Sequence, residues 1–187
     1  YAVTGVQTCA LPIWQHSPLF RKARARIAKR GIMSNDLRIR FLVVDDEPSI
    51  RKLCVTIGDK LGFICSEAES AEAALATLER QAADVVIADL KLPQMSGVNL
   101  LREIKQILPG VEVAIMTGHG TIESAVDAMK VGAYDYIEKP FRVEKLRLLL
   151  QRMAEKIRLV SENQVLRERM DTEVRLEIGR ASCRERV

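Results

Sequence analysis

The sequence predicts an α/β fold in which a doubly wound, five-stranded parallel sheet is covered by helices on both faces. Short apolar runs alternate with amphipathic segments five times along the chain, and the connections between them are short. One of these runs, residues 84–90, has an unbroken apolar centre, which is typical of a strand buried on both faces. This run delivers Asp89 to the carboxyl end of its strand, where chemistry is located in open parallel sheets.

The first strand–helix unit begins with the apolar run 40–44. Asp45 and Asp46 follow this predicted strand directly, and Pro48 suits the first turn of a helix. Apolar residues then recur at helical spacing until Gly62, which is predicted to close the helix as a C-cap.

The second and third units repeat this pattern. Residues 63–68 predict a shorter strand, and Ser70 can cap a helix over residues 71–81. The buried strand at 84–90 is followed by a loop with turn residues and by an amphipathic helix over residues 98–108.

The fourth unit consists of a strand over residues 111–116 and a helix over residues 122–131. The strand delivers Thr117 to its carboxyl end, and Thr121 can cap the helix. We therefore expect a hydroxyl group at the same edge of the sheet as the carboxylates of the first and third strands.

The fifth unit consists of a strand over residues 133–138, which ends at Lys139, and a helix from about residue 142 to about 176. Heptad spacing on this helix favours a parallel dimeric coiled coil, and the alternative is one long solvated helix. The heptad positions are Leu146, Leu150, Met153, Ile157 and Val160, followed by a seam shifted by one residue through Leu159, Asn163, Leu166 and Met170.

The high pI carries no information about partners, because the charge is unevenly distributed. Residues 33–176 contain 20 Lys+Arg and 23 Asp+Glu, so the predicted folded part is mildly acidic and the excess of basic residues lies in the tails. We expect no membrane association, since no apolar run approaches the roughly 18 residues of a membrane span. Cys54 and Cys65 lack metal-ligand spacing and predict a reducing compartment, so the expected localisation is cytoplasmic.

Four regions are expected along the chain. Residues 1–35 form an N-terminal tail, residues 36–152 the folded domain, residues 153–176 a coiled-coil-like linker helix, and residues 177–187 a C-terminal tail. Parts of both tails resemble translated sequencing-adapter sequence, so we expect them to be non-native, with Met33 as the start of the protein.

The groups at the strand ends suggest a common site. If the strands lie side by side, Asp45, Asp46 and Asp89 meet the hydroxyl of Thr117 and the ammonium of Lys139. Three adjacent carboxylates repel one another, and a hard divalent cation such as Mg²⁺ relieves this repulsion. One carboxylate could then attack phosphorus and form an acyl phosphate. The alternative for Asp45 and Asp46 alone is a pair of carboxylates that caps the following helix.

Several motifs together resemble the receiver domain of a two-component response regulator. The resemblance covers residues 38 to about 152 and implies a flavodoxin-like sheet in the order 2-1-3-4-5. The motifs are Val43-Val44-Asp45-Asp46-Glu47, Asp84-Val-Val-Ile-Ala-Asp89 with Pro93 and Gly97, Met116-Thr117-Gly118 and Tyr136-Ile-Glu-Lys139-Pro140-Phe141.

The resemblance implies a phosphoacceptor and a metal site. Asp89 would accept the phosphoryl group, and Mg²⁺ would be the cofactor. The metal would be bound by Asp46, by Asp45 directly or through water, by Asp89 itself, and by the backbone carbonyl of Lys91.

The resemblance also implies groups that stabilise the phosphoryl oxygens and a conformational switch. Thr117 and Lys139 would each contact a phosphoryl oxygen, and the bond between Lys139 and Pro140 would be a cis peptide. Tyr136 would be the switch aromatic, moving inward as Thr117 is drawn to the phosphate. Its alternative is half-buried packing on the sheet.

Residues 117–141 with the long helix resemble the nitrogen-regulator type, which activates sigma-54 polymerase. A sensor histidine kinase would then be the phosphoryl donor, and the chain would be a phosphorylation switch that dephosphorylates itself rather than an enzyme. We expect a homodimer through the C-terminal helix and no nucleic-acid binding by this segment, since it shows no helix-turn-helix. The alternatives are an unphosphorylated dimerisation module and a Mg²⁺-dependent aspartyl phosphatase. Phosphatases usually space their acids D-x-D, whereas Asp46 and Asp89 are far apart in the sequence.

Overall fold

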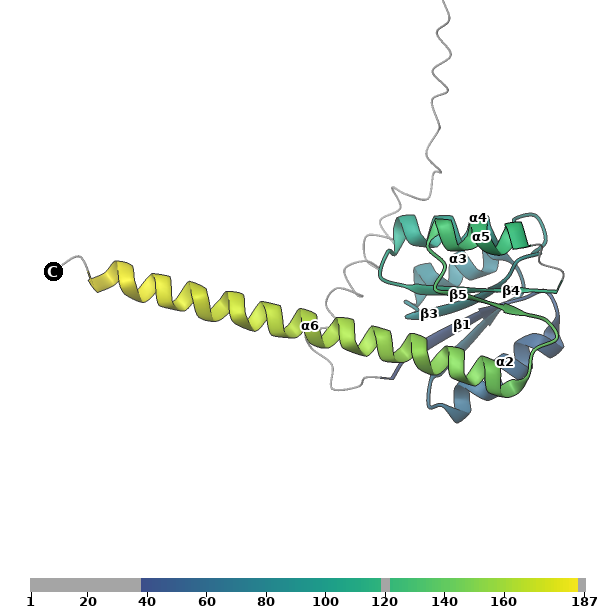
Figure 1. The fold of residues 1–187 in the computed structure, drawn as a ribbon, viewed down its shortest axis with the longest axis horizontal. Helices are drawn as coiled ribbons and strands as arrows, with labels where there is room; N and C mark the ends of the chain where they lie inside the picture. The colour runs from purple at the N-terminus through teal and green to yellow at the C-terminus, as the bar shows by residue number, and fades with distance from the viewer. Residues whose placement is uncertain (1–37, 119–121, 185–187) are drawn as a thin grey trace, which may run out of the picture.

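A five-stranded parallel sheet lies between two layers of helices in the computed structural model, which describes residues 38–118 and 122–184 (Figure 1). The strands stand in the order β2-β1-β3-β4-β5, and each neighbouring pair is parallel. The predicted fold class and strand order are therefore confirmed. The strands are β1 Arg40–Val44, β2 Ile64–Ala68, β3 Val85–Asp89, β4 Glu112–Thr117 and β5 Asp135–Glu138.

The helices cover both faces of the sheet. Helices α3, α4 and α5 lie on one face, and α2 and α6 lie on the other (Figure 1). Among the described residues, no helix combines the length and the apolar character that a membrane crossing requires. The helices are α2 Pro48–Lys60, α3 Ala71–Arg80, α4 Gly97–Ile107, α5 Ile122–Val131 and α6 Val143–Arg184.

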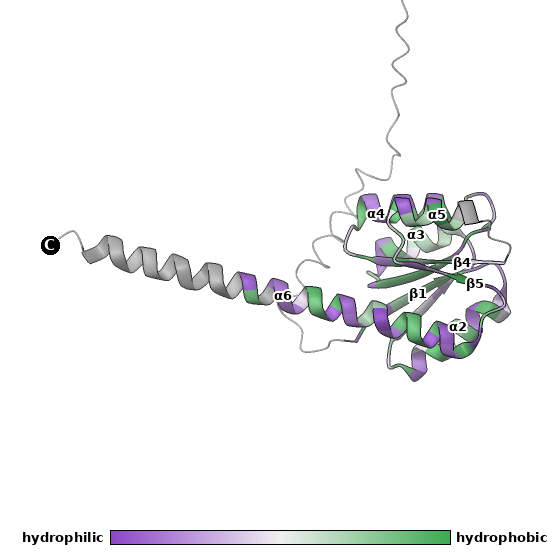
Figure 2. Ribbon diagram, in the orientation of Figure 1, coloured by the Kyte–Doolittle hydropathy of each residue, from purple (hydrophilic) through white to green (hydrophobic). Residues whose placement is uncertain are grey.

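Strand β3 is buried along its whole length, because side chains of successive residues enter two different cores. Val86 and Ala88 pack among residues of α3 and α4, whereas Val85 and Ile87 pack among residues of α2 and α6. Apolar residues accordingly dominate the inner strands β1, β3 and β4, and β1 and β4 are largely green in Figure 2. The apolar run therefore marks the central strand, whose carboxyl end is Asp89.

Local signals at the helix ends are largely those that the sequence predicts. The hydroxyl of Ser70 accepts a hydrogen bond from the backbone N–H of Ala73, at 3.2 Å, and so caps α3. Gly62 follows α2 with a φ of 76°, and Gly132 follows α5 with a φ of 104°, in the left-handed region that glycine tolerates. The predicted cap at Thr121 lies outside the described residues.

Helix α6 differs from its prediction in length and in what its apolar residues contact. It begins at Val143, close to the expected start, and continues past residue 176 to Arg184. Three of the predicted heptad positions are buried in the core beneath the sheet, namely Leu146, Leu150 and Met153. The core thus extends beyond residue 152, and part of the predicted coiled-coil seam packs against the domain itself.

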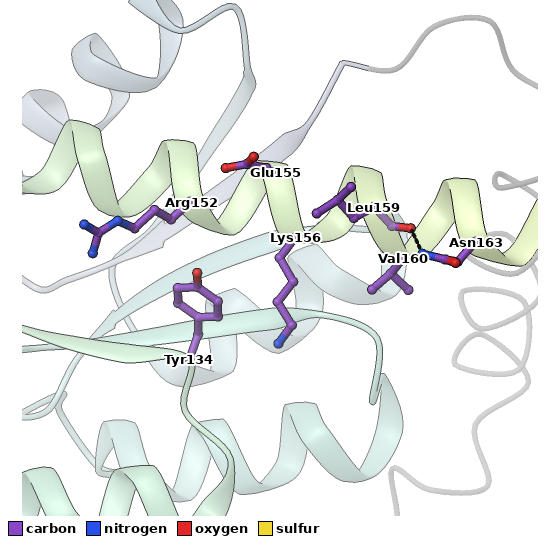
Figure 3. Close-up of a pocket in the computed structure, with 7 residues that line it drawn as sticks. All are labelled: Tyr134, Arg152, Glu155, Lys156, Leu159, Val160 and Asn163. Atoms are coloured by element: carbon purple, nitrogen blue, oxygen red, sulfur yellow. Dashed lines mark hydrogen bonds between the residues drawn. The ribbon is translucent and has the colours of Figure 1, made fainter.

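Lys156 anchors α6 near the amino end of β4. Its Nζ lies 2.8 Å from Oε1 of Glu112. The same atom lies 5.1 Å from the ring centroid of Tyr134, and both of these side chains are drawn in Figure 3. Further along the helix, Leu159 and Val160 are 53% and 57% exposed. Ile157 still packs against the core, so α6 leaves the domain just after this residue. An open groove of about 350 Å³ at this corner is lined by Tyr134, Arg152, Glu155, Lys156, Leu159, Val160 and Asn163.

Candidate functional site

The sheet register brings the carboxyl ends of its central strands to one edge. Val44 pairs with Ala88, so Asp45 and Asp89, one residue further on, emerge side by side from β1 and β3. Thr117 ends β4, and Lys139 follows β5. These side chains are far apart in the sequence, but they come together because parallel strands end at the same edge of the sheet.

Lys139 connects the two buried carboxylates. Its Nζ lies 2.5 Å from Oδ2 of Asp45 and 3.1 Å from Oδ2 of Asp89. Asp45 is fully buried and Asp89 is 7% exposed, so these charges are removed from water and depend on one another for compensation.

Asp46 completes a cluster of three carboxylates. One oxygen from each of Asp45, Asp46 and Asp89 lies within 4.8 Å of the others, and Asp46 is exposed to solvent. Such a set carries more negative charge than one lysine can balance. Carboxylate oxygens with an open solvent side fit a hard divalent cation, and Mg²⁺ favours sites of this kind.

Burial and charge shift the pKa values of this site. Burial raises the pKa of Asp45 above its ordinary value, although the hydrogen bond from Lys139 opposes this shift. Burial alone would lower the pKa of Lys139, but its hydrogen bonds and charge interactions with Asp45 and Asp89 together raise it. Lys139 is therefore a fixed positive charge at neutral pH.

Thr117 offers the site an unused hydroxyl group. The residue is 5% exposed, and its Oγ1 is buried without a hydrogen-bond partner among the residues that the structure describes. An unsatisfied buried polar group costs about 1–3 kcal/mol. A hydroxyl at the edge of an acidic site is thus ready to donate to an anionic oxygen that arrives there.

The capping alternative accounts for part of the turn after β1. Oδ1 of Asp45 accepts a hydrogen bond from the backbone N–H of Glu47, at 2.9 Å. The N-cap residue of α2 is Glu47, whose side chain makes no capping hydrogen bond. Only one oxygen of Asp45 serves the turn, and its other oxygen faces Lys139.

Two further residues of the predicted site lie at its margin. Lys91 is exposed in the loop after β3, and its role as a carbonyl ligand stays a prediction. Tyr136 lies on the edge strand β5, opposite Ile115 of β4, and is 45% exposed. The peptide bond between Lys139 and Pro140 is cis.

The sequence analysis missed Arg51. Its Nη1 donates to the backbone carbonyls of Asp45 and Asp46, at 2.7 and 3.1 Å. An arginine about one turn into the helix that follows an Asp-Asp pair could have drawn attention to it, because such a side chain can reach back to the preceding turn.

A doubly wound sheet with an acidic cluster, a lysine and a free hydroxyl at its carboxyl edge defines the class of response-regulator receiver domains. The family model described as "Response regulator receiver domain" matches residues 41–151, which is more than half of the chain. The chain belongs to this family.

Several of the proteins that this chain resembles are regulators of the NtrX and NtrC type. It is 44% identical over 127 residues to an NtrX-like response regulator of Rickettsia bellii, covering 67% of this chain and 27% of that protein. The crystal structure of NtrX from Brucella abortus is 40% identical, with a TM-score of 0.67, over 71% of this chain and 30% of that one. The solution structure of the beryllofluoride-activated NtrC4 receiver domain dimer is 36% identical, with a TM-score of 0.61, over 63% and 98% of the two chains. The chain thus spans about a quarter of the length of the curated relatives that it matches.

Proposed function

We propose that this domain is a phosphorylation switch in which Asp89 accepts a phosphoryl group from a sensor histidine kinase. The proposal rests above all on the contact of Lys139 with two buried carboxylates in a cluster of three. This arrangement leaves an anionic nucleophile beside a fixed positive charge, at the edge of the sheet where ligands bind.

The transfer requires one bond to form and one to break. An oxygen of Asp89 attacks phosphorus, the bond between phosphorus and the donor's imidazole nitrogen breaks, and the imidazole leaves with the bonding electron pair and takes up a proton. The product is an acyl phosphate on Asp89. Lys139 compensates charge on one phosphoryl oxygen and Thr117 donates a hydrogen bond to another, which uses its unpaired hydroxyl.

Mg²⁺ is the proposed cofactor. Asp45, Asp46, Asp89 and the backbone carbonyl of Lys91 would hold it, because three clustered carboxylates form an oxygen-rich site for a hard cation. When bound, the ion supplies positive charge against the repulsion between the carboxylates and the incoming phosphoryl group.

The switch is proposed to involve Thr117 and Tyr136. Thr117 lies in the site, and Tyr136 is exposed on the neighbouring edge strand, where its ring has room to move. Movement of Thr117 toward a phosphoryl oxygen would open space beneath Tyr136, whose inward rotation would change the surface formed by α5, β5 and α6.

The output is proposed to act through α6. The related NtrC4 receiver domain forms a dimer, and relatives include a transcriptional regulatory protein of Rhizobium meliloti. We infer a cytoplasmic homodimer in which the receiver, expected over residues 36–152, extends along α6 to Ala154, and the following part of the helix, to residue 176, leads to a transcriptional output domain. As a switch rather than an enzyme, it would reset by hydrolysis of its own acyl phosphate.

Mass spectrometry after incubation with acetyl phosphate and Mg²⁺ tests this proposal. The wild type should gain the mass of one phosphoryl group, and Asp89→Ala should gain none. Asp127→Ala, which removes an exposed carboxylate on α5, should behave as the wild type does. An unmodified wild type, or a modified Asp89→Ala protein, would contradict the role of Asp89.

A further inference from the structure

Arg51 contacts the backbone of the turn that carries two of the proposed metal ligands. Its Nη1 donates to the carbonyl oxygen of Asp45 at 2.7 Å and to that of Asp46 at 3.1 Å. Its Nε lies 3.6 Å from Oε2 of Glu67 on β2. The Arg51 side chain is 13% exposed, so its charge is largely enclosed by this turn and by the neighbouring strand.

These two carbonyl groups lie beyond the last residue of β1, and Arg51 donates a hydrogen bond to each of them. The backbone N–H of Asp45 still donates to Ala68 of β2, at 3.1 Å, but the chain then turns away toward α2. Carbonyls at such a departure point lose the partners of the strand ladder. The bond to the Asp45 carbonyl is part-buried, so this carbonyl in particular needs a protein donor, whereas the bond to the Asp46 carbonyl is exposed. The planar guanidinium of Arg51 can serve both carbonyls and Glu67 at once, because its donors form a rigid fork.

The carboxylates on this turn also repel one another and the carboxylate of Asp89. The carboxylates of Asp45, Asp46 and Asp89 lie within 4.8 Å, and Asp46 is exposed, so its side chain and backbone could move outward to relieve the repulsion. Arg51 opposes that movement by holding both carbonyls of the turn.

We propose that Arg51 is a positioning residue for the metal site. It holds the turn so that the carboxylates of Asp45 and Asp46 converge on Asp89 before a cation binds, and Glu67 orients its guanidinium. This inference rests on the proposed function of the acidic cluster as a Mg²⁺ site. Groups that orient metal ligands contribute strongly to affinity, and their loss typically weakens metal binding about 10–100-fold.

A purely electrostatic role predicts the opposite sign. The positive charge of Arg51 lies close to the cluster and would by itself repel a cation, so its removal would strengthen Mg²⁺ binding. Positioning predicts weaker binding after removal. Arg51→Met removes both charge and hydrogen bonds, whereas Arg51→Lys keeps the charge but lacks the fork.

The experiment is a titration of the full chain with Mg²⁺. Calorimetry measures the binding affinity, and NMR monitors the backbone amides. Arg51→Met and Arg51→Lys should each bind Mg²⁺ about tenfold more weakly than the wild type. In the metal-free proteins, the amide signals of Asp46 and Glu47 should also shift. Lys52→Met, which removes an exposed positive charge from the next residue of α2, is the matched control and should bind as the wild type does.

The possible results separate the alternatives. The positioning role is overturned if Arg51→Met binds Mg²⁺ more tightly and Arg51→Lys binds it as the wild type does. It is also overturned if both variants bind Mg²⁺ as the wild type does. In either case the metal site itself is retained. Absence of Mg²⁺ binding by the wild type overturns the metal site and this inference with it. If circular dichroism shows that Arg51→Met does not fold, Arg51→Lys and Glu67→Gln test the inference instead. Both variants should then bind Mg²⁺ more weakly than the wild type.

Discussion

At the scale of single residues, Asp45 and Lys139 form an ion pair in which burial dominates the pKa of Asp45 and pairing dominates the pKa of Lys139. Asp45 is 0% exposed, so the loss of hydration outweighs its hydrogen bond to Lys139 and raises its pKa. Lys139 is 15% exposed and interacts with two carboxylates, so pairing outweighs burial and raises its pKa. The lysine is therefore stabilised in its charged form, while ionised Asp45 retains a net cost of desolvation.

This cost predicts how the stability of the metal-free protein depends on pH. Because the pKa of Asp45 is raised above 3.8, the folded state binds its proton more tightly than the unfolded state. Its contribution to the free energy of unfolding is thus fully present below pH 3.8 and is lost as pH rises through the raised pKa. Asp45→Asn cannot titrate, so the stability of the wild type relative to this variant should fall as pH rises.

Urea denaturation of both proteins in EDTA, from about pH 4 to pH 7, measures this difference. Asp127→Asn, which removes an exposed carboxylate on α5, controls for the loss of one titrating group far from the pair. Parallel pH curves for the wild type and Asp45→Asn would contradict the predicted desolvation cost.

The sequence could predict those residues of the candidate site that directly follow or end a strand. Asp45, Asp89, Thr117 and Lys139 follow apolar runs, and parallel strands bring such positions to one edge. The position of Arg51 one turn into α2 could suggest a contact with the preceding turn, but its bonds to two particular backbone carbonyls could not be predicted. Sequence patterns record side-chain chemistry, and they contain little information about which carbonyls lose their partners in a turn.

At the scale of elements, Gly97 joins the start of α4 to the end of β3. Its backbone N–H donates to the carbonyl of Leu90, at 2.9 Å. A Cβ atom at Gly97 would lie 2.1 Å from the carbonyl oxygen of Asp89 and 2.9 Å from its carbonyl carbon. The helix can approach the backbone of Asp89 this closely only because residue 97 has no side chain, so this glycine serves close packing.

Gly97→Ala should therefore displace α4 from β3. Because the obstructing atoms are backbone, we expect a destabilisation of about 1–3 kcal/mol, and a slower gain of phosphoryl mass at Asp89. Gly110→Ala is the matched control, since a Cβ there would meet nothing within 4 Å. Urea denaturation of both variants measures the effect, and equal stability of Gly97→Ala and wild type would refute the close packing.

The sequence predicted which segments form strands and helices more accurately than it predicted the residues at which they begin and end. The predicted strand 133–138 begins at Asp135 in the structure, where its residue register with β4 begins, although the backbone N–H of Tyr134 already donates to the carbonyl of Val113, at 2.7 Å. The heptad pattern of α6 posed a deeper ambiguity. Leu146 and Leu150 have the spacing of a coiled-coil seam but pack against the sheet of their own domain. A helical apolar stripe has the same spacing whether it packs against a sheet or against a second helix.

At the scale of the whole molecule, α6 belongs to the domain over its first part and projects from it over the remainder (Figure 1). Its buried residues, the ion pair of Lys156 with Glu112 and the position of Lys156 over the ring of Tyr134 fix the direction in which the helix leaves the sheet; Figure 3 shows Lys156 and Tyr134. A change at the carboxyl edge of the sheet could therefore reach a partner of α6 as a movement of a rigid rod.

The proposed dimer can be located on this rod. Leu159, Val160 and Leu166 are 53%, 57% and 56% exposed, so they contribute little to the stability of the monomer. If α6 pairs with a second copy, burial of this apolar surface would contribute to association at about 25 cal/mol per Å². Replacing all three residues by Ser should therefore convert the dimer to a monomer and leave the melting temperature of the receiver unchanged.

Sedimentation velocity over a range of concentrations measures the effect. Leu148→Ser is the matched control, because Leu148 is 49% exposed on α6 but precedes the projecting part of the helix. Dimerisation through the surface of α5, β5 and α6 would instead respond to Leu148→Ser and persist in the triple variant. That result would move the interface from the projecting helix to the domain itself, and α6 would then be a solvated connection rather than a coiled coil.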